Sequence, residues 1–150
     1  MKFIVLIHLA STLTMVGVIL IIQIVHYPLF SNVAAESFIA YEARHTQLIT
    51  LIVLPLMLCE AISSLILTAQ PPPNIPTFPL WLGVIMLSII WGMTMIIHVP
   101  QHGLLSQGFD SITHNTLVSS NWIRTIAWIM RGLIALWIIY EMMPAVNASK

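Results

Sequence analysis

Residues Trp91–His102 have the sequence WGMTMIIHVPQH, and their character changes along the stretch. The first half is apolar and compatible with the hydrocarbon core of a bilayer. The second half places His98 and His102 on either side of Pro100. Such a change marks the point where a membrane helix meets water or a binding site. We therefore expect other polar side chains to gather at the same end of the molecule.

The composition of the chain places it in a membrane. Of its 150 residues, 59% are hydrophobic and only 7% are charged, and the mean hydropathy is +0.97. Soluble domains carry about 25% charged residues. Five basic and five acidic residues cancel, so no basic patch exists and nucleic acid is excluded as a partner. The one cysteine, Cys59, cannot form an intrachain disulfide.

Four apolar segments are predicted to cross the bilayer, over residues of about 3–27, 47–67, 81–99 and 121–140. The first has 25 uncharged residues, and at about 1.5 Å per residue it can cross a core of about 30 Å. We expect it to be retained, because no small-residue cleavage site follows it. A connector with five prolines, residues 71–79, separates the second and third spans. The sequence thus predicts an all-α, integral membrane four-helix bundle that forms a single domain over residues 1–150.

Short interfacial helices are expected in the first and third connectors. Asn32 is expected to cap a helix that runs into the second span, and Pro28 to end the first span. The third connector, residues 101–120, is polar and interrupted by glycine, and it carries Leu104, Leu105 and Phe109, which can pack against a membrane surface. We therefore expect short interfacial helices there. Asn121 is expected to cap the fourth span.

Two charged residues, Glu60 and Arg131, fall at mid-depth in the second and fourth spans. An unpaired charge at the centre of a bilayer costs about 2.5–3.5 kcal/mol on the mild insertion scales. Trp128 and Arg124 precede Arg131 at helical spacing and so share its face. The sequence predicts a buried ion pair between Glu60 and Arg131.

An even number of crossings gathers most of the histidines at one end of the bundle. The first and third connectors emerge together, whereas both termini and the proline-rich connector emerge on the other side. His8 alone lies at the terminal end. The group predicted at the connector end consists of His26, Glu42, His45, His98, His102 and His114. A lone histidine near a helix end is usually structural, and chance alone can place most of the histidines on one side. Three neighbours favour a functional site: Glu42 three residues before His45, the pair of His98 and His102 around Pro100, and Arg124 at the same depth.

Two kinds of cofactor suit this group. A metal site for iron, copper or zinc would take its ligands from the set His26, Glu42, His45, His98 and His102. A b-type haem would take axial imidazoles from His26 or His45 and from His98, with Arg124 at the propionates and Trp128 in the cofactor pocket. A single Glu-x-x-His unit disfavours a di-iron carboxylate centre, which needs two.

A third interpretation needs no cofactor. His102, Glu42 and Arg124 would act as catalytic groups in an acid–base pocket for a lipophilic substrate, or begin a proton path that continues through Arg131 and Glu60.

Short motifs along the chain carry a resemblance. They are Thr94-x5-Pro100-x-His102-x2-Leu105 with Trp128 and Arg131 on the following helix, and, in the first half, His26-Tyr27-Pro28-Leu29-Phe30, Tyr41–His45 and Pro55–Glu60. The chain resembles a broad family of small four-helix membrane proteins that includes anthrone-oxygenase-like members, and is most similar to an uncharacterised branch. The resemblance implies oxidative chemistry. His102 stands where the family usually has asparagine.

The sequence as a whole favours metal- or cofactor-assisted oxidative chemistry on a lipophilic small molecule. The alternatives are a haem-binding electron-transfer protein and a structural or assembly subunit; the pattern is also compatible with an oligomer. Lys2 and Lys150 flank the termini, and Arg44 is the one basic residue in a connector on the other side. The positive-inside rule then predicts cytoplasmic termini and an extracytoplasmic histidine-rich end.

Overall fold

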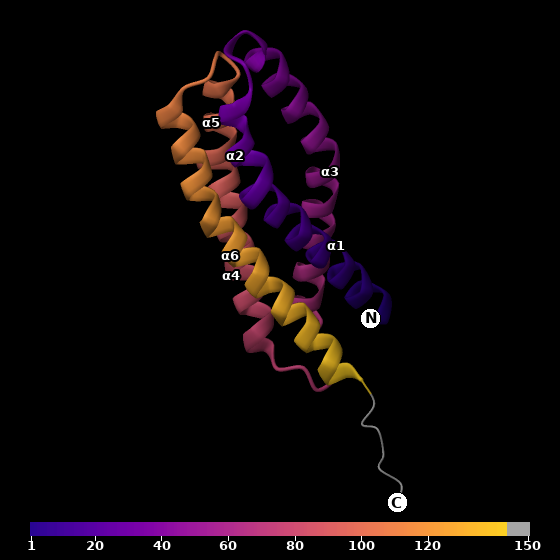
Figure 1. Ribbon diagram of the computed structural model, residues 1–150. Helices are drawn as coiled ribbons and strands as arrows, with labels where there is room; N and C mark the ends of the chain where they lie inside the picture. The colour runs from indigo at the N-terminus through magenta and orange to yellow at the C-terminus, as the bar shows by residue number, and fades with distance from the viewer. Residues whose placement is uncertain (144–150) are drawn as a thin grey trace, which may run out of the picture.

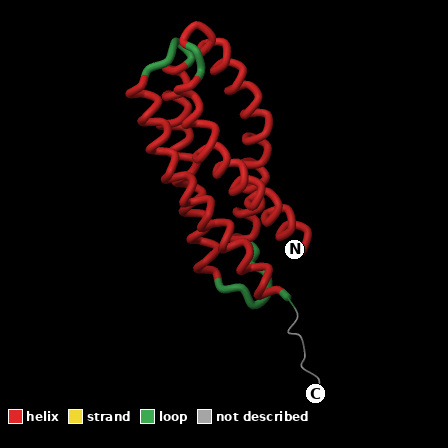
Figure 2. Tube along the Cα trace, in the orientation of Figure 1, coloured by secondary structure: helices red, strands yellow, loops and turns green. Residues whose placement is uncertain are grey.

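The structure, a computed structural model, describes residues 1–143, and this part of the chain contains helices and connecting loops but no strand (Figure 2). Four helical rods are long and apolar enough to cross a membrane: Lys2–Asn32, Ala35–Ala69, Thr77–Leu105 and Ser111–Met142. The predicted all-α four-helix bundle is confirmed. The four rods support a multi-pass integral membrane protein.

The rods contain irregular turns at defined places. The first rod is α1 (Lys2–Ile21), the π-helix η1 (Ile22–His26), α2 (Tyr27–Leu29) and the 3-10 turn η2 (Phe30–Asn32). The second rod is α3 (Ala35–Ala69). The third is α4 (Thr77–Met93), the π-helix η3 (Thr94–His98) and α5 (Val99–Leu105), and the fourth is α6 (Ser111–Met142).

The rods alternate in direction, so the connectors gather as predicted. Figure 1 shows the loops after η2 and α5 together at one end of the bundle, here called the connector end. The N-terminus, the proline-rich loop and the end of α6 lie at the other end. Residues that are far apart in the sequence therefore lie close together at the connector end.

Pro28 does not end the first rod, contrary to the prediction, and Pro100 likewise lies inside the third. A proline ring clashes with the carbonyl four residues earlier and has no N–H to donate. In both rods a π-helical turn precedes the proline and ends at a histidine two residues before it, at His26 and at His98. The wider turn relieves the clash, so the rod continues through the proline.

The third connector is shorter than predicted, because α5 ends at Leu105 and α6 begins at Ser111. The separate interfacial helices expected over residues 101–120 are the ends of the two long rods. Asp110 caps α6, with its carboxylate accepting from the Thr113 N–H at 2.7 Å. The expected cap Asn121 is buried inside α6. Asn32 is not a cap either, since Ala34 precedes α3 and makes no side-chain cap.

The predicted pair of Glu60 and Arg131 is confirmed and lies fully inside the bundle. Arg131 Nε donates to Glu60 Oε1 at 2.8 Å, and Arg131 also donates to the Gly83 carbonyl. Thr12 donates to the same carboxylate oxygen at 3.1 Å, and Trp128 Nε1 donates to the other at 3.0 Å. These residues come from α1, α3, α4 and α6, so one carboxylate and one guanidinium tie all four rods together.

Candidate functional site

A chain of three side chains lies at the connector end, and each comes from a different rod. His102 in α5 is joined through Nδ1 to Glu42 Oε1 of α3 at 2.5 Å. His102 Nε2 is joined to the Tyr27 hydroxyl of α2 at 3.0 Å. Glu42 has no exposed surface and Tyr27 is 3% exposed, whereas His102 between them is 15% exposed, so this carboxylate–imidazole–phenol chain, called the relay below, is buried at both ends and accessible at its imidazole.

The hydrogen-bond partners set the direction of the relay. A carboxylate only accepts, so Nδ1 of His102 carries a proton and donates it to Glu42. In the neutral imidazole Nε2 is then the acceptor, and the Tyr27 hydroxyl donates to it. His102 can take the phenol proton, and the buried carboxylate then stabilises the imidazolium that forms. This is the logic of a base oriented by a third group.

His114 holds the relay in place from α6. Its imidazole is buried, and Nε2 donates to the Tyr27 carbonyl at 2.8 Å. Nearby, Gln23 Oε1 in η1 accepts from Asn121 Nδ2 at 2.9 Å, and its amide donates to the Val118 carbonyl at 3.2 Å. These bonds fasten the π-helical segment of the first rod to α6. The sequence assigned no role to His114, and the structure shows a positioning contact.

A cavity of about 460 Å³ lies over the relay, between α3 and the third rod. Its polar lining consists of Tyr27, His45, His98, His102 and Arg124, together with Thr46, Thr50, Thr94 and Ser106. Its walls are apolar and include Ile49, Val53, Met57, Trp91 and Met95. A small number of polar groups in an apolar pocket is the usual form of a small-molecule site.

Several buried polar atoms around this cavity have no partner in the described residues. Both ring nitrogens of His98 are unpaired although the side chain is only 2% exposed. The indole nitrogen of Trp91 and Nε of Arg124 are unpaired as well. Buried polar groups are almost always hydrogen-bonded, because leaving one unpaired costs about 1–3 kcal/mol. Their concentration on one cavity indicates a place for a polar group of a ligand.

Among the described residues, Arg124 is the one lysine or arginine in the lining of this cavity. Its Nη1 donates to Asn121 Oδ1 at 3.3 Å, and its guanidinium lies 5.2 Å from the centre of the Trp128 ring. Neither contact neutralises the charge of Arg124, and its guanidinium also lies beside the Tyr27 hydroxyl, so the charge faces both the relay and the cavity. Trp128 does not line the cavity: it lies behind Arg124 and bonds Glu60.

Four of the five predicted metal ligands form two separate pairs instead of surrounding one point. His26 Nε2 bonds His45 Nδ1 at 2.8 Å, and Glu42 bonds His102. His98 stands apart on the cavity wall. Within residues 1–143, no group of three or more His, Cys, Asp or Glu side chains has a geometry that could hold a metal ion. The geometry does not support the predicted metal set.

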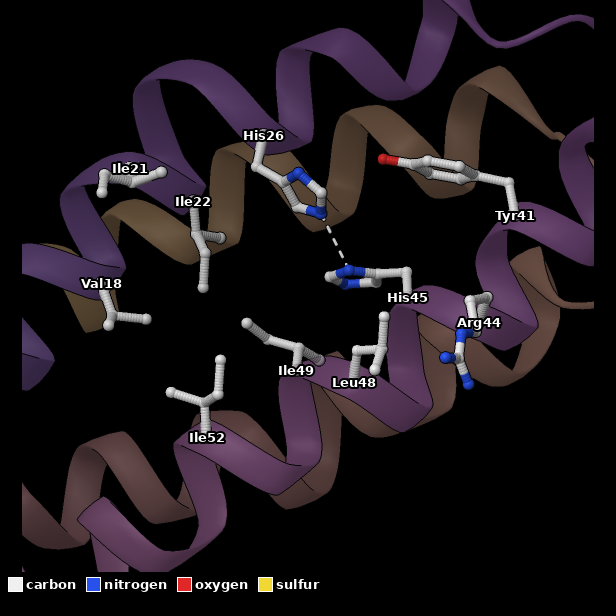
Figure 3. A pocket seen from close by; sticks show the side chains of 10 residues that line it. All are labelled: Val18, Ile21, Ile22, His26, Tyr41, Arg44, His45, Leu48, Ile49 and Ile52. Atoms are coloured by element: carbon white, nitrogen blue, oxygen red, sulfur yellow. Dashed lines mark hydrogen bonds between the residues drawn. The ribbon is translucent and has the colours of Figure 1, made fainter.

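A second cavity, of about 430 Å³, lies on the other side of His45, between the first rod and α3 (Figure 3). The bonded pair of His26 and His45 lies with Tyr41 and Arg44 toward one end of it, and aliphatic side chains form the rest. The sequence placed both histidines in the metal or haem site. In the structure, His45 lies between two cavities and lines both of them.

Tyr27 is the site residue that the sequence analysis missed. Its position beside His26 and Pro28 offered a signal, because a phenol at the end of a membrane helix is either an interfacial anchor or a buried polar group that needs a partner. Which of these two applies to Tyr27 depends on the side of the helix on which its phenol lies, and the π-helix η1 sets that side. The result is a buried hydroxyl facing His102.

Comparisons with family models, with curated proteins and with solved structures give no match to this chain. The interpretation of the site rests on its own geometry.

Proposed function

We propose that this protein is a membrane enzyme that catalyses proton transfer on a lipophilic small molecule carrying a carbonyl or hydroxyl group. The observation that carries the proposal is the relay, which ends at a cavity where both ring nitrogens of His98 and Nε of Arg124 have no partner among the described residues. Geometry of this kind meets the first requirement for general acid–base catalysis, which is hydrogen-bond reach between the groups that exchange the proton.

Each side chain has a defined part in the proposed step. The Tyr27 oxygen takes a proton from the substrate while its own proton passes to Nε2 of His102. Glu42 stabilises the resulting imidazolium, and Arg124 stabilises the negative charge that develops on the substrate oxygen. The reverse sequence returns a proton to the substrate at another atom, which makes the net reaction an isomerisation and leaves the relay unchanged.

Recognition would combine His98 with the apolar walls. Either ring nitrogen of His98 can donate or accept according to its tautomer, so it can bond a carbonyl or a hydroxyl. Leu54, Met95 and Val99 line the cavity and are also exposed on the outside of the bundle. In a bilayer these exposed side chains face acyl chains, so a lipophilic substrate can enter from the membrane.

The test is a comparison of lipid-soluble compounds in cells that carry wild-type protein or a relay variant. His102→Gln, Glu42→Gln and Tyr27→Phe should each cause the same compound to accumulate, because loss of general acid–base catalysis slows a reaction by about 10²–10⁴-fold. His8→Gln is the matched control, since His8 is also buried and hydrogen-bonded but lies at the other end. The proposal fails if the three variants are made at normal levels and no compound accumulates.

A second candidate is the metal- or haem-assisted oxidative chemistry that the sequence favours. One observation supports it: the two unpartnered nitrogens of His98 leave an imidazole free to bind a metal. Metal content and the absorption spectrum of purified protein separate the two candidates. A Soret band, or iron, copper or zinc at one per chain that is lost in His98→Ala, would favour the oxidative function over the acid–base function.

A further inference from the structure

The cavity between the first rod and α3 is a groove with a gradient of polarity. Val18, Ile21 and Ile22 form one wall, and Leu48, Ile49 and Ile52 form the other. His26, Tyr41, Arg44 and His45 lie at the end nearest the connectors (Figure 3). Val18 lies eight residues before His26, so the apolar part extends about 12 Å along the helix.

The groove opens to the outside of the bundle. Ile21, Leu48 and Ile52 line it and are 63%, 45% and 53% exposed. In a membrane these faces meet hydrocarbon, and a lipid acyl chain is the molecule present there at high concentration. The apolar length of about 12 Å along the helix and the aliphatic walls suit an acyl chain lying parallel to the helices.

The polar end of the groove carries an uncompensated positive charge. Among residues 1–143, Arg44 is the one exposed cation at the connector end, and it forms no ion pair there. The Tyr41 hydroxyl makes no hydrogen bond with another described residue, and Figure 3 shows it directed toward the side of the groove where His26 lies. Guanidinium and phenol groups beside an imidazole pair can all donate to phosphate oxygens.

We propose that this groove is a binding site for an anionic phospholipid, with the acyl chain against Val18, Ile22 and Ile52 and the headgroup at Arg44 and Tyr41. Charge complementarity selects the anionic class, since no exposed acidic residue lines the groove to balance Arg44. The site is separate from the relay, and the proposal does not depend on the proposed function. The two cavities meet at Ile22, His45 and Ile49, which line both.

The test is native mass spectrometry of protein in detergent titrated with phosphatidylglycerol or phosphatidylcholine. Wild-type protein should retain phosphatidylglycerol about fivefold more strongly than phosphatidylcholine, the preference that one basic residue near a surface provides. Arg44→Gln should reduce that preference to none. Lys2→Gln, which removes an exposed cation at the other end, should leave it unchanged.

A second pair of variants tests the groove itself. Ile52→Trp fills the apolar part and should reduce retention of both lipids. Ile62→Trp is the matched control, because Ile62 lies on the same helix with similar exposure but outside the groove. Equal retention of the two lipids by wild-type protein, or a preference that persists in Arg44→Gln, would overturn the proposal. Neither result would affect the accumulation test of the relay.

Discussion

His98 shows at the scale of one residue how a site differs from a packed core. Gln23 and His114 are buried and hydrogen-bonded, whereas His98 is buried with neither nitrogen bonded to a described residue. A group kept in this state destabilises the fold unless a ligand bonds it. This cost in stability is expected at a binding site, where the ligand supplies the missing hydrogen bonds.

Replacing His98 should therefore separate stability from function. His98→Phe removes two unpaired buried nitrogens while keeping an aromatic ring, and we expect it to raise the unfolding free energy by about 1–2 kcal/mol. The same variant should cause the accumulation expected of the relay variants. Thermal unfolding in detergent checks the first effect. His114→Phe, which loses the bond to the Tyr27 carbonyl, should lower stability; a fall for both variants would contradict the argument.

The pair of Glu60 and Arg131 offers a second prediction at the residue scale. Glu60→Met leaves a buried guanidinium without its carboxylate and should cost about 3–5 kcal/mol of unfolding free energy. The double variant Glu60→Met with Arg131→Met should be more stable than either single variant, because no charge remains unpaired. Unfolding midpoints of the four proteins check this order. A double variant as unstable as the sum of the two singles would contradict it.

At the residue scale, the sequence predicts a contact correctly where one contribution to the free energy is much larger than the others. The cost of a charge in hydrocarbon predicts that Glu60 must meet Arg131, and it does. The same reasoning cannot choose among five neighbouring histidines and Glu42, because imidazoles can bond one another as readily as they bind a metal. The pairing of His26 with His45 follows from side-chain directions that the sequence does not contain.

At the scale of elements, two prolines are accommodated by π-helical turns that also present histidines. The sequence rule that proline ends a helix placed a boundary at Pro28, whereas η1 lets the rod pass through it. A different rule, the preference of asparagine for helix N-caps, placed the start of the fourth span at Asn121. The residues from Ser111 to Ser120 are polar yet helical, since they extend α6 beyond its apolar part.

The cap of α6 gives a pH prediction. Hydrogen bonding by Thr113 lowers the pKa of the Asp110 carboxyl. A folded-state pKa below the unfolded value of about 3.9 means that the contribution to stability is complete at neutral pH. That contribution is lost as the pH falls through the folded pKa.

Asp110→Asn tests this dependence, because asparagine caps a helix as well as aspartate does but does not titrate. Its melting temperature should match wild type at neutral pH and fall less below about pH 4. Asp110→Ala should be less stable than both at neutral pH. Equal acid sensitivity of the wild type and Asp110→Asn would show that the cap makes no titrating contribution.

At the scale of the whole molecule, the antiparallel order of four rods was predictable and decides where the site lies. Hydropathy and the proline-rich connector fix the number of crossings, and an even number brings Tyr27, Glu42 and His102 to one end. The orientation of that end stays a prediction from Lys2, Lys150 and Arg44, of which Lys150 lies outside the described residues.

Cysteine accessibility tests the orientation. In a Cys59→Ala background, Ser106→Cys at the connector end should react with a membrane-impermeant maleimide added to intact cells. Asn74→Cys in the proline-rich loop should react only after the membrane is opened. The reverse pattern would place the site on the cytoplasmic side.

The relay is tested most directly by ¹⁵N NMR of histidine-labelled protein in lipid nanodiscs. Wild-type protein should show a strongly deshielded Nδ1 proton that His102→Gln removes, that Glu42→Gln shifts upfield, and that His8→Gln leaves in place. Tyr27→Phe should shift Nε2 of the same ring. A His102 resonance that is unaffected by Glu42→Gln and Tyr27→Phe would contradict the existence of the relay and, with it, the proposed chemistry.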